Sequence, residues 1–210
     1  LAALTGNIQP LSRSPEGQFE GALALDAPGD LGFPTFRLTL GGQTSTQVGP
    51  GRIEVLSPGR LTRVRVLSES GVARTGPGSD YSRLTPLPKG TQASVTGWDG
   101  DWLRLDYGGW LHRREVEVLG EGLPPHHSLV RSLQIHGVPG WTEVRIPLQA
   151  PVPVQLAVSE KRLELTLHQT TAQTDTIRFD PDPLISSLTW QQAAPGQVRY
   201  TLQLAAPLLW

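Results

Sequence analysis

Glycine and proline interrupt this sequence so often that no long helix can form. There are 23 Gly and 19 Pro among 210 residues, and they are scattered rather than periodic. Both residue types break helices and mark turns, so they favour many short strands. Apolar and polar residues alternate with period two between the turns, as in Thr35-Phe36-Arg37-Leu38-Thr39-Leu40, and this pattern is typical of half-buried strands. The sequence therefore predicts an all-β protein.

Composition excludes several classes of partner and chemistry. The formal net charge is −1, so the chain lacks the positive field that supplies most nucleic-acid affinity, and we expect no nucleic-acid partner. There is no Cys, which excludes disulfides, thiolate metal ligands and a thiol nucleophile. No apolar run is long enough to predict a membrane span. The chain also has no Met, and we expect a removed signal peptide or a trimmed chain at its start, and an end cut from a longer protein.

The turn-rich segments divide the chain into three predicted modules. Residues 1–60 form a β-sandwich-like unit that ends near Ser57-Pro58-Gly59. Residues 61–120 contain five short strand candidates, which suit a small barrel. A linker with two prolines follows, and residues 126–210 form the third module.

The third module contains an internal repeat. Residues 132–135, a Pro-Gly pair and residues 144–149 are followed, at an offset of 54 to 56, by residues 187–190, a second Pro-Gly pair and residues 198–203. Two copies predict a pseudo-symmetric domain of two similar β-sheets. Chance similarity between two β-hairpins is the alternative.

No segment predicts an active site. The five His are His112, His126, His127, His136 and His168, and without an accompanying carboxylate-rich segment we interpret them as surface or linker residues. Paired aspartates such as Asp99 and Asp101 lie in turns, where they normally bond their own backbone. We expect no catalysis, no metal and no cofactor in this chain.

Tryptophan is concentrated in the middle module. Trp98, Trp102 and Trp110 lie close together in the sequence, with Tyr107 among them. Period two places Trp102 and Arg104 on one face and the intervening leucines on the other. Trp102 could face either the core or solvent, and we expect Trp110 in the core.

These residues resemble the bacterial SH3 (SH3b) domain. The matching segments are Ala73–Asp80 with its Arg-x-Gly-Pro, Leu87-Pro88-Lys89-Gly90-Thr91, Gly97–Leu105 with Gly-Asp-Trp-Leu-Arg, and Gly109-Trp110-Leu111. The resemblance implies an SH3-like barrel that binds peptidoglycan and is not itself an enzyme. It implies ligand contacts in a groove at Arg74, Tyr81, Trp98, Trp102 and Tyr107.

The third module resembles the AMIN domain, a peptidoglycan-targeting module of two similar β-sheets. The residues that carry this likeness are Arg162–Leu167, Thr171–Asp175 and Asp182–Ile185. AMIN domains of this form precede zinc-dependent N-acetylmuramoyl-L-alanine amidase domains, whose zinc-ligand motif is absent here. The resemblance thus implies that zinc belongs only to a catalytic domain beyond Trp210, and it suggests contacts at Arg145, Trp190 and Arg199.

The leading hypothesis is a non-catalytic, peptidoglycan-binding and targeting region of a periplasmic cell-wall amidase. Two weakly binding modules would hold the enzyme near its substrate by raising its effective concentration. A second hypothesis is an autoinhibitory or protein-docking region whose partner is its own catalytic domain or a divisome protein. A third, an intact hydrolase, is the least favoured.

Overall fold

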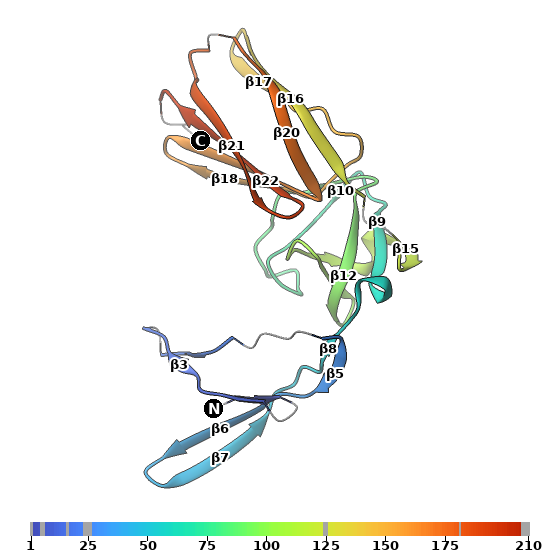
Figure 1. Ribbon diagram of the computed structural model, residues 1–210, viewed down its shortest axis with the longest axis vertical. Helices are drawn as coiled ribbons and strands as arrows, with labels where there is room; N and C mark the ends of the chain where they lie inside the picture. Colours follow the sequence, from blue (N-terminus) through green and yellow to red (C-terminus); the bar gives the residue numbers. More distant parts are fainter. Residues whose placement is uncertain are drawn as a thin grey trace. The chain divides into compact units, whose positions relative to one another are not determined.

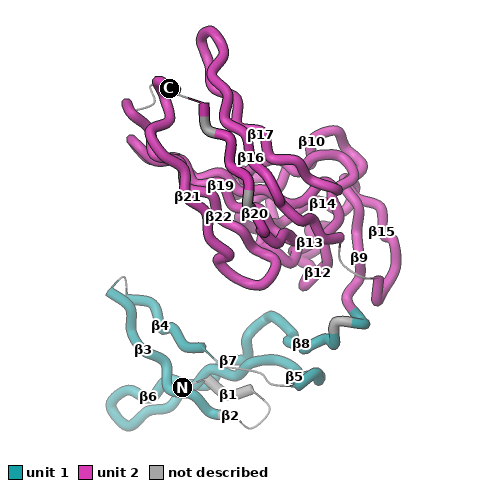
Figure 2. Tube along the Cα trace, turned by 45° about the horizontal axis from the view of Figure 1, so that its top comes forward, with its two compact units in different colours: residues 1–60 teal, residues 61–210 magenta. Residues whose placement is uncertain are grey.

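The computed structural model describes residues 2–4, 7–15, 17–22, 27–123, 126–180 and 182–206. The protein is all-β, and the helices among the described residues are two short 3₁₀ turns. The chain divides into two compact units, Leu1–Arg60 and Leu61–Trp210, which are coloured separately in Figure 2. The predicted all-β class is confirmed.

The first unit contains a four-stranded sheet in the order β2-β1-β6-β7 and two two-stranded ribbons, β3-β4 and β5-β8. Its elements are β1 (Ala2–Leu4), β2 (Asn7–Gln9), β3 (Ser12–Arg13), β4 (Phe19–Glu20), β5 (Gly29–Gly32), β6 (Thr35–Leu40), β7 (Gln43–Val48), β8 (Ile53–Val55) and the 3₁₀ turn η1 (Pro58–Arg60). A β-sandwich packs two sheets over a shared core. No described large apolar side chain of this unit is buried, and Leu40 is 79% exposed, so the described residues do not form such a core.

The second unit begins with the middle module, a five-stranded antiparallel sheet in the order β14-β13-β12-β9-β15 and a ribbon of β10 and β11. Its elements are β9 (Thr62–Val66), β10 (Ser70–Gly71), β11 (Leu87–Pro88), β12 (Gln92–Asp99), β13 (Trp102–Leu105), β14 (Trp110–His112), the 3₁₀ turn η2 (Arg113–Glu115) and β15 (Val116–Glu121). Register shifts at Val95/Gly97 and Val118/Gly120 are of the kind that bends a sheet around a core. That core contains Val64, Val66, Leu87, Leu105 and Leu111.

The C-terminal module contains two sheets, β17-β16-β20 and β18-β19-β22-β21 (Figure 1). Its strands are β16 (Ser128–Val138), β17 (Trp141–Arg145), β18 (Val154–Ser159), β19 (Arg162–His168), β20 (Thr170–Phe179), β21 (Ile185–Ala194) and β22 (Gln197–Leu204). Both sheets contribute to one apolar cluster, with Leu133 and Ile135 from β16 and Val198, Tyr200 and Leu202 from β22.

Each copy of the sequence repeat forms an antiparallel hairpin, β16–β17 in one sheet and β21–β22 in the other. Gly140 and Gly196 in the two turns have positive φ, 87° and 71°, which glycine adopts without a steric penalty. The repeat thus corresponds to two equivalent hairpins that lie in different sheets of one module.

Candidate functional site

The alternation of β13 and β14 separates their side chains into an inner and an outer face. Leu105 and Leu111 are buried in the core of the middle module. The cross-strand pairs Trp102↔His112 and Arg104↔Trp110 therefore lie together on the opposite, outer face. Trp102 is half-buried there. It therefore lies on the face away from the core, a question that the sequence left open. Trp110 is also half-buried on this face, so the expectation of a core position for it is wrong.

Arg74 is fixed beside Trp102 by its own backbone. Its N–H donates to the carbonyl of Trp110 at 2.8 Å, and its carbonyl accepts from the N–H of Trp110 at 2.9 Å. Its guanidinium donates from Nη1 to the carbonyl of Tyr81 at 2.7 Å. The guanidinium carbon lies 6.0 Å from the Trp102 ring centroid, at the outer limit of a cation–π contact.

His112 also contacts the Trp102 ring. The two ring centroids are 5.1 Å apart at an interplanar angle of 72°, an edge-to-face contact of the kind aromatic rings prefer. The backbone N–H of Arg114 donates to Nδ1 of His112 at 3.2 Å. The neutral imidazole therefore carries its proton on Nε2, which remains as a donor for other partners.

A groove of about 580 Å³ opens beside these side chains; its lining residues are Val72, Arg74, Gly78, Ser79, Asp80, Arg83, Trp102, His112, Arg114 and Glu115. Three arginines and two carboxylates line it. Oε2 of Glu115 already accepts from the backbone N–H of Val72 at 2.8 Å, so this oxygen is engaged in a bond that holds the fold. The groove thus combines an aromatic platform with an excess of guanidinium groups, which suits a ligand with an apolar surface and a carboxylate.

The Tyr81 ring lies next to the groove, because it packs against the backbone at Gly76 and Gly78. A Cβ on Gly76 would fall inside the contact distance of the Tyr81 ring, and one on Gly78 would lie 3.2 Å from it. Gly78 itself lines the groove. The glycine of the Arg-x-Gly-Pro segment therefore lets the Tyr81 ring pack directly on the backbone beside Arg74.

The other two middle-module candidates lie elsewhere. Trp98 pairs with Leu103, whereas Trp102 pairs with Asp99, so Trp98 and Trp102 point to opposite faces of the sheet. Trp98 is 73% exposed. Tyr107 contacts His168 of the C-terminal module, with ring centroids 5.3 Å apart. The structure brings Arg74, Tyr81 and Trp102 together but not Trp98 or Tyr107.

The three C-terminal candidates do not form a cluster with one another on a shared surface. Arg145 is exposed and donates to the Glu143 carboxylate at 2.9 Å. Trp190 pairs with the buried Tyr200 and packs against the apolar cluster of its own module. Arg199 is half-buried, and its Nε is buried without a hydrogen-bond partner. Trp190 therefore supports the core, and Arg145 is the most accessible of the three.

Sequence reasoning missed Arg83, His112 and Arg114 as groove residues. The alternation of β14 relates His112 to Trp110 and could have indicated their shared face. Arg83 reaches the groove through its isolated bridge with Arg74, a pairing for which the local sequence has no signal.

No group of three or more metal-ligating side chains is found within the described part of the chain. None of the described helices is long and apolar enough to cross a membrane. A scan against protein-family models, a search of curated proteins and a search of solved structures each found no match to this chain. Fold and site together define an all-β protein with a basic, aromatic-lined surface groove.

Proposed function

We propose that this chain is a non-catalytic peptidoglycan-binding and targeting region of a bacterial cell-wall amidase. The observation that carries the proposal is the groove in which the Arg74 guanidinium, the Trp102 ring and the His112 ring lie side by side. The resemblance of the middle module to SH3b domains and of the C-terminal module to AMIN domains points to the same ligand. Peptidoglycan lies in the cell envelope, so this function requires export to the periplasm.

The ligand group that fits the groove best is a peptide with a free carboxylate. Arg74, Arg83 and Arg114 supply guanidinium groups, and such groups pair with carboxylates in a planar, two-bonded geometry. The Trp102 ring offers an apolar face for the aliphatic part of a residue. The stem peptides of peptidoglycan are short and end in carboxylates, so they carry the group that these arginines would pair with.

A pair of synthetic stem peptides tests this assignment. One carries a free terminal carboxylate and the other a terminal amide, and binding to the full chain is followed by isothermal titration calorimetry. We expect amidation to weaken binding by about tenfold or more, because it removes a charge-assisted hydrogen bond. Equal affinity of the two peptides contradicts recognition of the carboxylate.

Two tryptophan variants provide the matched comparison on the protein. Trp102→Ala removes the platform and is expected to lower the affinity for the carboxylate peptide by about tenfold or more. Trp98→Ala removes an equally large but exposed ring that lies on the opposite face, and it is expected to leave the affinity unchanged. Equal effects of both variants would argue against this groove as the binding site.

A further inference from the structure

One residue of the second unit has an unfavourable backbone conformation. Gln169, between β19 and β20, has a φ of 51° and is the only non-glycine residue with positive φ in the described ranges. Residues other than glycine rarely adopt this region, and they keep it only where the surroundings impose it. The carbonyl of Gln169 accepts from the N–H of Ser128 at 2.9 Å, and the N–H of Thr170 donates to Gly196 at 3.0 Å. These bonds hold the strained turn in place.

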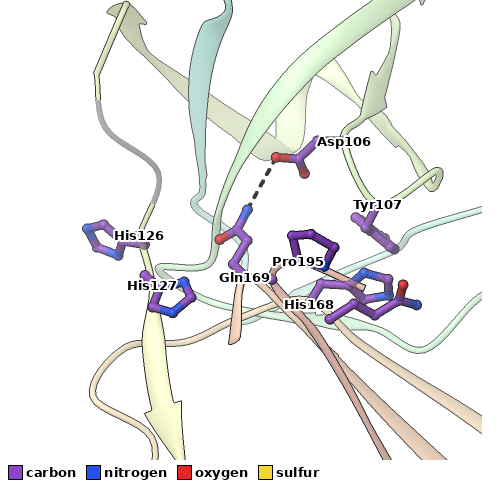
Figure 3. A pocket seen from close by; sticks show the side chains of 9 residues that line it. Asp106, Tyr107, His126, His127, His168, Gln169 and Pro195 are labelled. Carbon is purple, nitrogen blue, oxygen red and sulfur yellow. Dashed lines mark hydrogen bonds between the residues drawn. The ribbon is translucent and has the colours of Figure 1, made fainter. Parts of the chain in front are cut away.

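The side chain of Gln169 extends from this turn into a pocket of about 350 Å³ between the middle and C-terminal modules (Figure 3). Such a volume is at the small end of the range of about 300–1,000 Å³ for small-molecule sites. The residues that line this junction pocket are Asp106, Tyr107, His126, His127, His168, Gln169, Pro195, Gly196 and Gln197. All of them belong to the second compact unit.

Unpaired polar atoms are concentrated in the junction pocket. Across the described residues, six buried side-chain atoms have no hydrogen-bond partner, and three of them, Tyr107 Oη, His126 Nδ1 and Gln169 Oε1, belong to residues that line it. Buried polar groups are nearly always paired, and an unpaired one is costly. A ligand that pairs with these atoms therefore gains more than it would on an ordinary surface.

The Gln169 amide is oriented so that its oxygen remains available. Its Nε2 donates to Oδ2 of Asp106 at 3.4 Å, as the dashed line in Figure 3 shows. Oε1 is therefore an acceptor to which no described protein group donates. The Tyr107 hydroxyl remains protonated at neutral pH because burial and the neighbouring Asp106 raise its pKa, so it can donate. The pocket thus suits a ligand that has both hydrogen-bond donors and hydrogen-bond acceptors.

The electrostatics of the pocket disfavour an anionic ligand. None of the described residues that line it is Lys or Arg, and Asp106 is the carboxylate among them. Burial lowers the pKa of His168, so this imidazole is neutral near pH 7. The tilted rings of Tyr107 and His168, together with Pro195, provide apolar faces. A sugar ring combines an apolar face of C–H groups with a rim of hydroxyls, and it matches both features.

We propose that the junction pocket binds a neutral saccharide, with Gln169 accepting a hydroxyl or amide hydrogen and the rings of Tyr107 and His168 facing the sugar. This site shares no residue with the arginine-lined groove. Its existence does not depend on the function proposed for that groove.

Chitotetraose, a neutral and soluble oligosaccharide of N-acetylglucosamine, is a suitable probe. The full ¹⁵N-labelled chain is titrated and followed by amide chemical shifts. We expect saturable shifts centred on residues 106–107, 168–169 and 196–197. Absence of saturable shifts at millimolar chitotetraose overturns the proposal, and shifts confined to the groove residues do so as well.

The Gln169→Gly variant tests the affinity for chitotetraose separately from the stability of the fold. Glycine accommodates a φ of 51°, so the melting temperature should stay the same or rise, while the affinity for chitotetraose falls by about tenfold or more. Tyr107→Phe keeps the ring and removes the unpaired hydroxyl, and it should also weaken binding without loss of stability. Wild-type affinity in both variants overturns the proposal, because the pocket would then hold only water.

Two further variants serve as controls. Gln203→Ala removes an exposed glutamine of β22 and should leave chitotetraose binding unchanged. Trp102→Ala alters the groove and should also leave it unchanged. A loss of chitotetraose binding in Trp102→Ala would assign the saccharide to the groove and overturn a separate site at the junction.

Discussion

At the scale of single residues, two glycines of the middle module lie where an aromatic ring packs directly on the backbone. A Cβ on Gly76 would overlap the Tyr81 ring, and a Cβ on Gly109 would overlap the Tyr107 side chain. The sequence singled out both glycines within the Arg-x-Gly-Pro and Gly-Trp-Leu segments. The contacts provide a physical reason for glycine at these positions, because any side chain there would displace the ring.

Gly76→Ala tests this reason. We expect a loss of about 1–3 kcal/mol in the free energy of unfolding, since the new methyl forces the Tyr81 ring out of its position. Gly97→Ala is the matched control, because its Cβ would meet no atom closer than 3.8 Å. Urea denaturation monitored by fluorescence measures both. A Gly76→Ala protein as stable as the Gly97→Ala protein would show that Tyr81 does not pack as described.

His168 makes one contribution to the pH dependence of stability. Burial lowers its pKa from the ordinary 6.5, and the nearby Asp106 opposes this only in part. The unfolded chain therefore binds a proton more readily than the folded one. The contribution of neutral His168 is present above pH 6.5 and is lost as the pH falls below that value. We expect wild-type protein to lose stability as the pH falls from about 6.5 to about 5.5.

Replacing the titrating group checks this assignment. His168→Gln cannot gain a proton, so its free energy of unfolding should fall less over the same pH interval in urea denaturation. If wild-type protein and the variant lose equal stability, His168 is not the group responsible.

At the scale of elements, alternation predicts strands well, but it does not show which face of a strand is buried. The pattern of Trp102-Leu103-Arg104-Leu105 shows which residues share a face. It does not show which face is buried, because either set of side chains is large enough to fill a core. The packing of Leu105 and Leu111 against other strands decides this. The hairpins of the sequence repeat were easier to anticipate, since each lies within one short segment with its own Pro-Gly turn.

The candidate site was predictable only where its residues are neighbours in sequence or strand pairing. Trp102 lies in a strong local motif, and Arg74 was found through its Arg-x-Gly-Pro segment. The contact between Asp106 and Gln169 joins residues 63 positions apart, and a positive φ at a glutamine has no sequence signature. Long-range contacts of this kind could not be read from a single sequence.

At the scale of the whole molecule, both apolar clusters consist of residues from the second unit. Contacts within that unit join its modules, including the bond from the backbone N–H of Leu156 to Oγ1 of Thr85 at 3.1 Å. The first unit has no buried large apolar side chain among its described residues. Burial of apolar surface is the main stabilising contribution to folding, so stability should reside in residues 61–210.

A fragment of residues 61–210 tests this distribution. We expect it to unfold in one cooperative thermal transition, with a melting temperature within about 4 °C of that of the full chain, a shift that corresponds to about 1 kcal/mol for a protein of this size. Circular dichroism measures both. Loss of the cooperative transition in the fragment would show that residues 1–60 contribute to the core.

The central claim is that the chain binds peptidoglycan through the groove at Arg74 and Trp102. Co-sedimentation of the full chain with purified, protein-free peptidoglycan at low salt tests it most directly. We predict that wild-type protein pellets with the wall, and that Arg74→Ala and Trp102→Ala leave a larger fraction in the supernatant than Trp98→Ala does. Wild-type protein that remains in the supernatant at low salt contradicts the claim.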